Sequence, residues 1–141
     1  MPASTPTLWL RPGRERSLKR RHPWVFSGAV ARVDGGPGPG ETVAVRSTDG
    51  ELLARAAFSP SSQIRARAWT FVDEPVDEGL IARRLAAAIA ARGGPAADAP
   101  ESACRLVYAE SDGLPGVIVD RYAATLVVQL LTAGAEHWRA T

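Results

Sequence analysis

Residues 41–58 read ETVAVRSTDGELLARAAF, and this stretch carries the strongest local signal of the chain. In its first half Val43 and Val45 alternate with polar residues, which is typical of a half-buried strand. Asp49-Gly50 then favours a two-residue turn, and an apolar run returns up to Phe58. The stretch therefore predicts an antiparallel β-hairpin.

Short strands are also expected on both sides of this hairpin. Residues 64–70 alternate with Ile64, Ala66 and Ala68 on one face, and residues 7–10 predict a first strand. A short helix over 14–21 should end before Pro23, followed by an extended segment over 24–33 and a Gly-Pro loop over 35–40. Several short strands separated by turns predict a small barrel over roughly residues 6–71.

The pattern changes after Asp73-Glu74-Pro75. Asp77 is a candidate helix cap, and the apolar residues from Ile81 to Ile89 have helical spacing. A small-residue linker is expected at 95–100, strands at 105–110, 117–120 and 126–131, and the start of a helix from Gly134. The expected fold class is thus mixed β and α+β, with a barrel at 1–72 and a small α+β domain at 73–141. We expect that second domain to be incomplete, because a helix and three strands bury little surface of their own.

Composition excludes several classes of protein. No apolar stretch is long enough to span a membrane, and the N-terminus lacks the pattern of a signal peptide, so a cytoplasmic protein without membrane contact is expected. The single cysteine, Cys104, excludes an internal disulfide, and with only His22 and His137 beside it no zinc site is expected.

The charge is unevenly distributed. Residues 1–32 hold seven basic side chains against one acidic, a net charge of +6, whereas the rest holds ten basic and 14 acidic, a net charge of −4. A basic end on an acidic chain is typical either of a site for a polyanion such as RNA or of a well-solvated terminal segment.

Two groups of side chains are candidates for binding RNA phosphates. The first is Arg14, Lys19, Arg20, Arg21 and His22, followed by Trp24, which could stack on an unpaired base. Because Val25 and Phe26 follow it, the core is the favoured place for Trp24. The second group is Arg65 and Arg67, which strand alternation places on one face; an ordinary solvent-exposed face remains the alternative.

Other motifs favour structural roles. Glu110, Asp112 and Asp120 bring three carboxylates together, but their spacing does not match a calcium loop, and Asp-Gly and Pro-Gly are common turn sequences. Cys104 has no obvious base beside it and is interpreted as a packing residue, not a nucleophile. No strand is followed by a G-x-G-x-x-G turn or a Walker loop. We therefore expect no catalytic, cofactor-binding or metal-binding residue in this chain.

Three segments together resemble a known family. SLKRRHPWVFSGAV at 17–30, SPSSQIRAR at 59–67, and RLV at 105–107 with ESDGLPG at 110–116 and VDRY at 119–122 are similar, in this order, to class I S-adenosylmethionine-dependent methyltransferases that modify cytosine C5 in large-subunit ribosomal RNA. The resemblance implies an RNA-binding PUA domain, a pseudo-barrel, then a central α+β domain, and then a Rossmann-like domain. Only the PUA domain and most of the central domain would be present here, so S-adenosylmethionine is implied for the full-length parent alone.

The resemblance leaves three functions open. The first is the RNA-binding, substrate-positioning N-terminal part of a ribosomal RNA cytosine-C5 methyltransferase. The second is a stand-alone PUA-type RNA-binding protein without enzymatic activity. The third is part of a PUA-bearing methyltransferase that acts on a different RNA or base.

Overall fold

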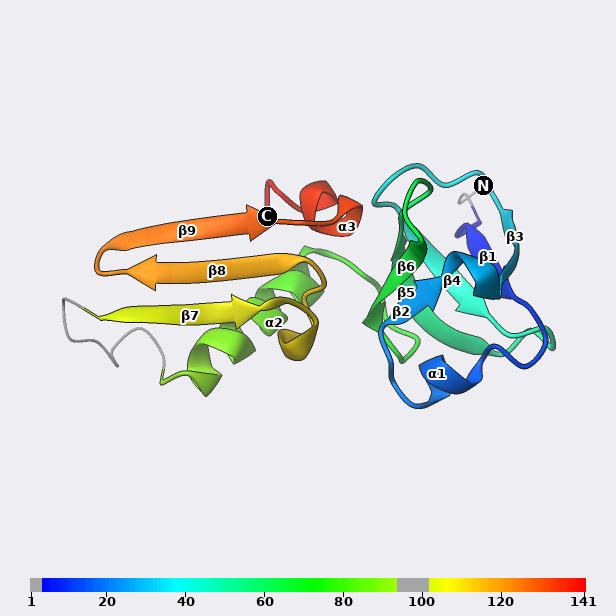
Figure 1. Ribbon diagram of the computed structural model, residues 1–141, viewed down its shortest axis with the longest axis horizontal. Coiled ribbons are helices and arrows are strands. Elements are labelled where there is room, and N and C mark those ends of the chain that lie inside the picture. Colours follow the sequence, from blue (N-terminus) through cyan, green and yellow to red (C-terminus); the bar gives the residue numbers. More distant parts are fainter. Residues whose placement is uncertain (1–3, 94–101) are drawn as a thin grey trace.

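Two β-sheets lie side by side in the computed structural model, which describes residues 4–93 and 102–141 (Figure 1). The larger sheet has six strands in the order β2-β6-β5-β4-β1-β3, and the smaller has three in the order β7-β8-β9. The strands of the first are β1 (Thr7–Leu10), β2 (Trp24–Phe26), β3 (Val30–Asp34), β4 (Thr42–Arg46), β5 (Leu52–Phe58) and β6 (Ile64–Thr70). Those of the second are β7 (Ala103–Tyr108), β8 (Val117–Tyr122) and β9 (Thr125–Leu130).

The predicted hairpin is confirmed as β4 and β5. Val45 pairs with Ala54 in an antiparallel register. The turn is not the two-residue Asp49-Gly50 turn that the sequence predicts. The Gly50 N–H donates to the Ser47 carbonyl at 3.0 Å and the Ser47 N–H to the Glu51 carbonyl at 3.0 Å, which leaves a three-residue loop that ends at Gly50 with a φ of +89°. The six-stranded sheet is curled (Figure 1), and within it β1 pairs in parallel with β4 and antiparallel with β3. Its interior is filled by fully buried side chains such as Leu8 and Val43. The predicted barrel followed by an α+β region is therefore present.

The segment between β1 and β3 is less regular than its sequence predicts. The helix expected over 14–21 is the single turn α1 (Arg16–Lys19), and the expected extended segment is interrupted by the 3₁₀ helix η1 (Ser27–Ala29). Only Leu18 of α1 is buried, which leaves little apolar surface to hold a longer helix on the barrel.

Around the small sheet the helices are α2 (Glu78–Ala91), the 3₁₀ helix η2 (Ala109–Asp112) and α3 (Ala133–His137). Asp77 caps α2 as predicted, since its Oδ1 accepts the Leu80 N–H at 2.9 Å. The strand expected over 105–110 ends at Tyr108, because η2 begins there. The linker predicted at 95–100 lies outside the described residues.

The part of the chain after the barrel, residues 73–93 and 102–141, is called the second unit. It completes its core with residues of the barrel. Its buried cluster contains Leu80, Ile81 and Val107 together with Ala57 of β5 and Trp69 of β6. Gly134 in α3 allows the close approach, because a Cβ there would collide with the side chain of Ala57. The small sheet and the barrel are thus packed against each other and share a core.

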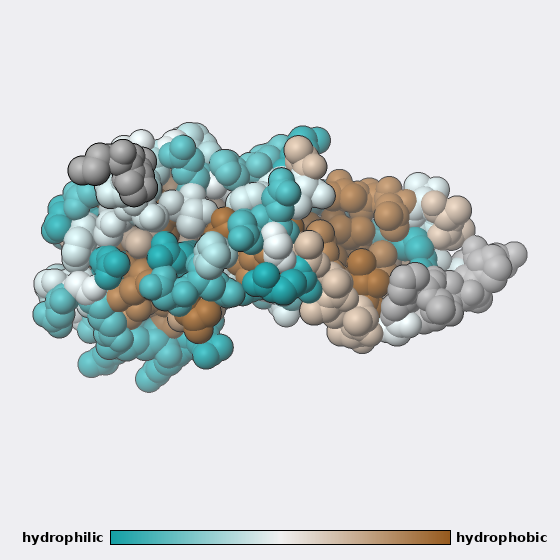
Figure 2. Space-filling view, turned by 180° about the vertical axis from the view of Figure 1, so that it is seen from behind, coloured by the Kyte–Doolittle hydropathy of each residue, from teal (hydrophilic) through white to brown (hydrophobic). Residues whose placement is uncertain are grey.

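Apolar side chains remain exposed on the small sheet. β9 is the strongly apolar strand expected near 126–131, yet Leu126 is 58% and Val128 56% exposed. Figure 2 shows hydrophobic colour concentrated on this half of the molecule, whereas the barrel half is mainly hydrophilic. None of the helices in residues 4–93 and 102–141 is long and apolar enough to cross a membrane.

Candidate nucleic-acid interface

The first predicted group of cations gathers on the surface around α1. All five of its members, Arg14, Lys19, Arg20, Arg21 and His22, are exposed. Within the described parts of the chain, the guanidinium groups of Arg14, Arg20 and Arg21 form no ion pair. Unpaired, solvated cations can exchange their counterions for the phosphates of a nucleic acid. We call these five residues the α1 cluster.

Lys19 differs from the arginines of this cluster. Its Nζ lies 2.8 Å from a carboxylate oxygen of Glu51, and this hydrogen bond raises the pKa of Lys19 above its ordinary value. The ammonium group is therefore charged but already has an anionic partner. A phosphate would have to compete with Glu51 for it, so the arginines are better placed to bind RNA.

Arg21 occupies an uncommon backbone conformation. Its φ is +63°, in the left-handed region that glycine favours. The turn is fixed by hydrogen bonds from the Arg21 N–H to the Leu18 carbonyl at 2.8 Å and from the His22 N–H to the Ser17 carbonyl at 2.9 Å. The chain thus keeps a charged side chain at a position where glycine would be less strained.

A row of aromatic rings follows the cluster along β2. The rings of His22 and Trp24 meet edge to face at 5.7 Å between centroids, and those of Trp24 and Phe26 at 6.2 Å. The prediction that Trp24 lies in the core is wrong: it is only partly buried, and Val25 is the buried residue of β2 at 3% exposure. Alternation explains this, since neighbours in a strand face opposite sides.

The second predicted group is less accessible than the first. The side chain of Arg67 is 16% exposed and its Nε lies 3.9 Å from Glu110, while Arg65 is half-buried with its Nε bonded to the Ser62 carbonyl at 3.2 Å. Burial lowers the pKa of Arg67, and the Glu110 carboxylate opposes that shift. The guanidinium stays charged but offers little surface to a ligand.

β2 connects the two groups. Trp24 pairs with Arg67 in the register of β2 and β6, and its indole N–H donates to Glu110 at 3.0 Å. Arg67 therefore lies beside the aromatic row. Arg67 also lines a hollow of about 310 Å³ with the serines of the 59–62 loop and Thr132.

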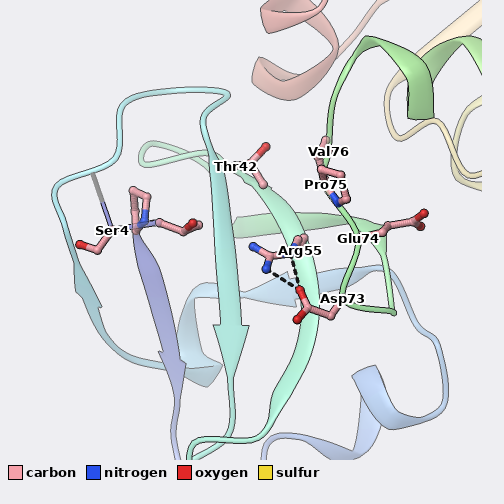
Figure 3. Close-up of a pocket in the computed structure, with 9 residues that line it drawn as sticks. Ser4, Thr42, Arg55, Asp73, Glu74, Pro75 and Val76 are labelled. Carbon is pink, nitrogen blue, oxygen red and sulfur yellow. Dashed lines mark hydrogen bonds and ion pairs between the residues drawn. The ribbon is translucent and has the colours of Figure 1, made fainter. Parts of the chain in front are cut away.

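A larger hollow of the barrel lies elsewhere. It has a volume of about 590 Å³ and is lined by Thr42, Arg55 and the segment 73–76 (Figure 3). Its guanidinium, that of Arg55, points at Asp73 and binds it through Nε at 3.1 Å. Because Arg55 already has a carboxylate partner, the residues that line this hollow include no unpaired cation that could bind a phosphate.

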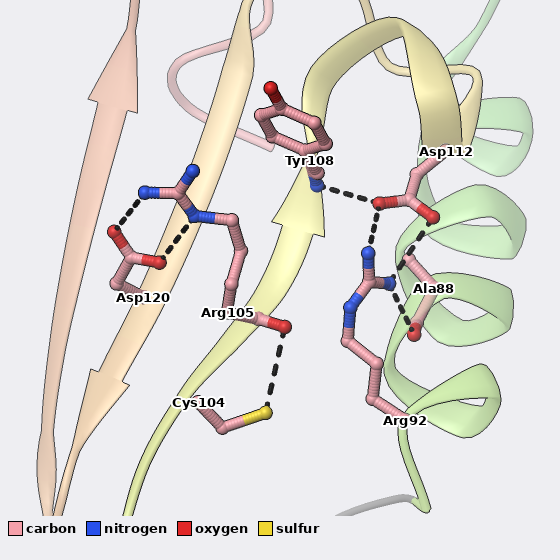
Figure 4. Close-up of polar contacts among 7 residues, drawn as sticks. All are labelled: Ala88, Arg92, Cys104, Arg105, Tyr108, Asp112 and Asp120. Atoms are coloured by element: carbon pink, nitrogen blue, oxygen red, sulfur yellow. Dashed lines mark hydrogen bonds and ion pairs between the residues drawn. The ribbon is translucent and has the colours of Figure 1, made fainter.

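The acidic motif has the structural role that its turn sequence predicts (Figure 4). Asp112 accepts hydrogen bonds from Arg92 at 2.8 Å and from the Tyr108 N–H at 2.6 Å, which joins η2 to α2. Asp120 pairs with Arg105 across β7 and β8 at 2.8 Å. In the described residues no three His, Cys, Asp or Glu side chains gather where they could hold a metal.

Cys104 lies within β7, not ahead of it. It is half-buried and packs against the second core, and its Sγ bonds the Arg105 carbonyl at 3.5 Å. These contacts fit the packing role expected for it.

Two exposed residues of this surface were not among the predicted site residues. Arg16 lies on α1 and adds a further cation to the cluster. Phe26 is 51% exposed at the end of the aromatic row. The charge count over residues 1–32 could have identified Arg16, whereas the exposure of Phe26 depends on tertiary structure and gives no sequence signal.

Known proteins are similar to this chain in sequence and in fold. Residues 8–71 match the model of the PUA-like domain family, which confirms the expected fold of the barrel. "Ribosomal RNA large subunit methyltransferase I" of Erwinia tasmaniensis is 55% identical over 137 residues, 96% of this chain and 35% of the relative. The protein of the same name from Shewanella amazonensis is 53% identical over 94% of this chain and 34% of the relative, and that from Vibrio cholerae is 47% identical over 97% and 34%.

Solved structures share the fold. A candidate SAM-dependent methyltransferase from Streptococcus mutans superposes with a TM-score of 0.80 at 16% identity, covering 95% of this chain and 35% of that chain. A second candidate methyltransferase, complexed with SAH, superposes with a TM-score of 0.81 at the same identity. The chain spans about a third of the length of the curated relatives it matches. Along nearly its whole length it is similar to part of the large-subunit ribosomal RNA methyltransferases, as its three sequence motifs predicted, and its residues 8–71 match the PUA-like domain family.

Proposed function

We propose that this chain binds RNA and positions it for a SAM-dependent ribosomal RNA cytosine-C5 methyltransferase. The α1 cluster carries this proposal, because three exposed arginines without ion-pair partners in the described chain lie on a PUA-like domain. Cations in this state supply most of the sequence-independent affinity of RNA-binding proteins. The relatives' name adds the RNA class, the large-subunit ribosomal RNA.

The proposal also covers the organisation of the chain. Residues 1–72 form the RNA-binding domain, and 73–141 a central α+β domain that depends on the barrel for part of its core. S-adenosylmethionine is the cofactor of the longer methyltransferase and is held by residues outside this chain. The protein acts in the cytoplasm, where ribosomal RNA is modified, and needs no metal for binding.

One experiment separates this function from general polyanion binding. The chain is titrated into labelled segments of large-subunit ribosomal RNA, with small-subunit segments and heparin as competitors. We expect a large-subunit segment to be bound best. Equal competition by heparin and both RNAs would contradict the substrate class, and no binding at low salt would contradict RNA binding itself.

A second experiment tests where the cofactor is held. The sequence has no glycine-rich strand–turn–helix, so isothermal calorimetry of this chain with S-adenosylmethionine should show no binding heat. Micromolar binding would contradict the assignment of the cofactor to another part of the methyltransferase.

A further inference from the structure

We propose that Phe26 stacks on an unpaired base of the bound RNA, so that the chain prefers single-stranded over fully paired RNA. This inference rests on the proposed RNA-binding function and adds the kind of nucleotide recognised. Phe26 carries an aromatic ring that is 51% exposed. Single exposed apolar side chains are common on proteins, so exposure of Phe26 by itself decides nothing.

The ring of Phe26 is held in place. It packs edge to face on Trp24, whose indole N–H is fixed by Glu110 at 3.0 Å and whose other neighbour is the ring of His22. Glu110 in turn faces Arg67, so the carboxylate behind the row has a cationic partner and repels RNA less. A ring that is already ordered loses little conformational entropy when a base stacks on it.

A cleft lies directly beside this ring. It has a volume of about 170 Å³ and lies between β2, α1 and η1. Its walls include Phe26, Leu18 and Gly28, and Arg14 and Ser17 add polar groups. An apolar wall next to an unpaired guanidinium suits a nucleotide, whose base is flat and apolar on its faces and whose phosphate is anionic.

The geometry favours an unpaired base over a duplex. In an A-form helix the bases are stacked on each other, and proteins contact mostly phosphates and 2′-hydroxyls. A base in a loop, a bulge or an end can leave the stack and lie on a protein ring. Arg20 and Arg21, on the turn before β2, can hold the adjoining phosphates of such a strand.

The test compares two RNAs and three variants of this chain. Labelled single-stranded RNA and a duplex of equal length are titrated with wild type, Phe26→Leu and Phe26→Tyr. The Leu variant should lose about 5- to 100-fold in affinity for the single strand and keep its affinity for the duplex. The Tyr variant should bind like wild type. Tyr122→Leu, which removes a ring of 53% exposure from β8, is the matched control and should change neither affinity.

A second measurement does not depend on the folding of any variant. A single strand carrying 2-aminopurine should change its fluorescence on binding wild type, because the base exchanges its neighbours in the strand for the ring of Phe26. No change in fluorescence together with wild-type affinity of Phe26→Leu would overturn this inference and leave the proposed RNA binding intact. If wild type bound neither RNA, the proposed function itself would fail.

Discussion

At the scale of single residues, a substitution of Arg21 should change the stability of the chain and its affinity for RNA in opposite directions. Its left-handed backbone costs on the order of 1 kcal/mol relative to glycine. Arg21→Gly should therefore raise the free energy of unfolding by up to about 1 kcal/mol, measured by urea denaturation. The same variant should bind RNA more weakly, with the slope of log K against log salt reduced by about 0.7 if one phosphate contact is lost.

Ala123 provides the control for Arg21. It also has a positive φ, of +52°, but lies in the turn between β8 and β9. Ala123→Gly should give a similar gain in stability and no change in RNA affinity. An Arg21→Gly variant with unchanged affinity would show that this side chain does not contact RNA and that its strained turn has another cause.

At the scale of elements, the contact between η2 and α2 predicts that the free energy of unfolding depends on pH. Burial by itself would raise the pKa of Asp112, but hydrogen bonds from Arg92 and the Tyr108 N–H outweigh it and hold the pKa below its ordinary value of 3.8. A carboxylate with a lowered pKa stabilises the folded state above about pH 4, and this contribution is lost as the pH falls through the folded pKa.

Asp112→Asn should accordingly destabilise the chain by about 1–3 kcal/mol at neutral pH, because it removes a charged acceptor of two partners. Urea unfolding at several pH values should show this gap staying constant from about pH 5 to 8 and narrowing below about pH 4. Asp49→Asn, at the exposed hairpin turn, should change little at any pH. If the difference in stability between wild type and Asp112→Asn were as large at pH 3 as at pH 7, the charge of the Asp112 carboxylate would not be what stabilises the contact.

Elements made by local signals were predicted well from the sequence. The hairpin of β4 and β5, strand β6 and the cap of α2 each depend on alternation, a turn dipeptide or a capping residue, and these are short-range effects. The parallel pairing of β1 with β4 joins segments distant in the sequence, and no local pattern specifies it.

The same limit applies to the candidate site. Alternation predicts correctly that Arg67 and Trp69 share a face of β6, but not that the second unit covers this face, which leaves Trp69 1% exposed. The α1 cluster was predictable because closely spaced cations in a short segment are almost never buried. Phe26 was missed because its exposure follows from the edge position of β2 in the sheet.

At the scale of the whole molecule, the barrel and the small sheet should unfold together. Trp69 of the barrel belongs to the second core, and Gly134 of α3 lies against Ala57 of β5. Gly134→Ala places a methyl group into that contact and should cost about 1–3 kcal/mol in the free energy of unfolding, in a single transition.

Gly28→Ala is the comparison for this prediction, because a Cβ at Gly28 meets nothing within 4 Å. It should change the stability by less than about 1 kcal/mol. Two separate transitions in the wild type would show that the barrel and the small sheet fold independently. Equal effects of the two substitutions would show that the contact between Gly134 and Ala57 does not contribute to stability.

The central claim, that the α1 cluster binds RNA, is tested most directly by affinity across a salt series. With about four phosphate contacts, wild type should show a slope of roughly −3 for log K against log salt, and Arg20→Ala plus Arg21→Ala should flatten it by about one to two units. Arg83→Ala plus Arg139→Ala removes the same charge from exposed arginines of the second unit and should leave the slope unchanged. If the Arg20 and Arg21 double variant remains folded with wild-type affinity and slope, the α1 cluster is only a solvated surface and the account is wrong.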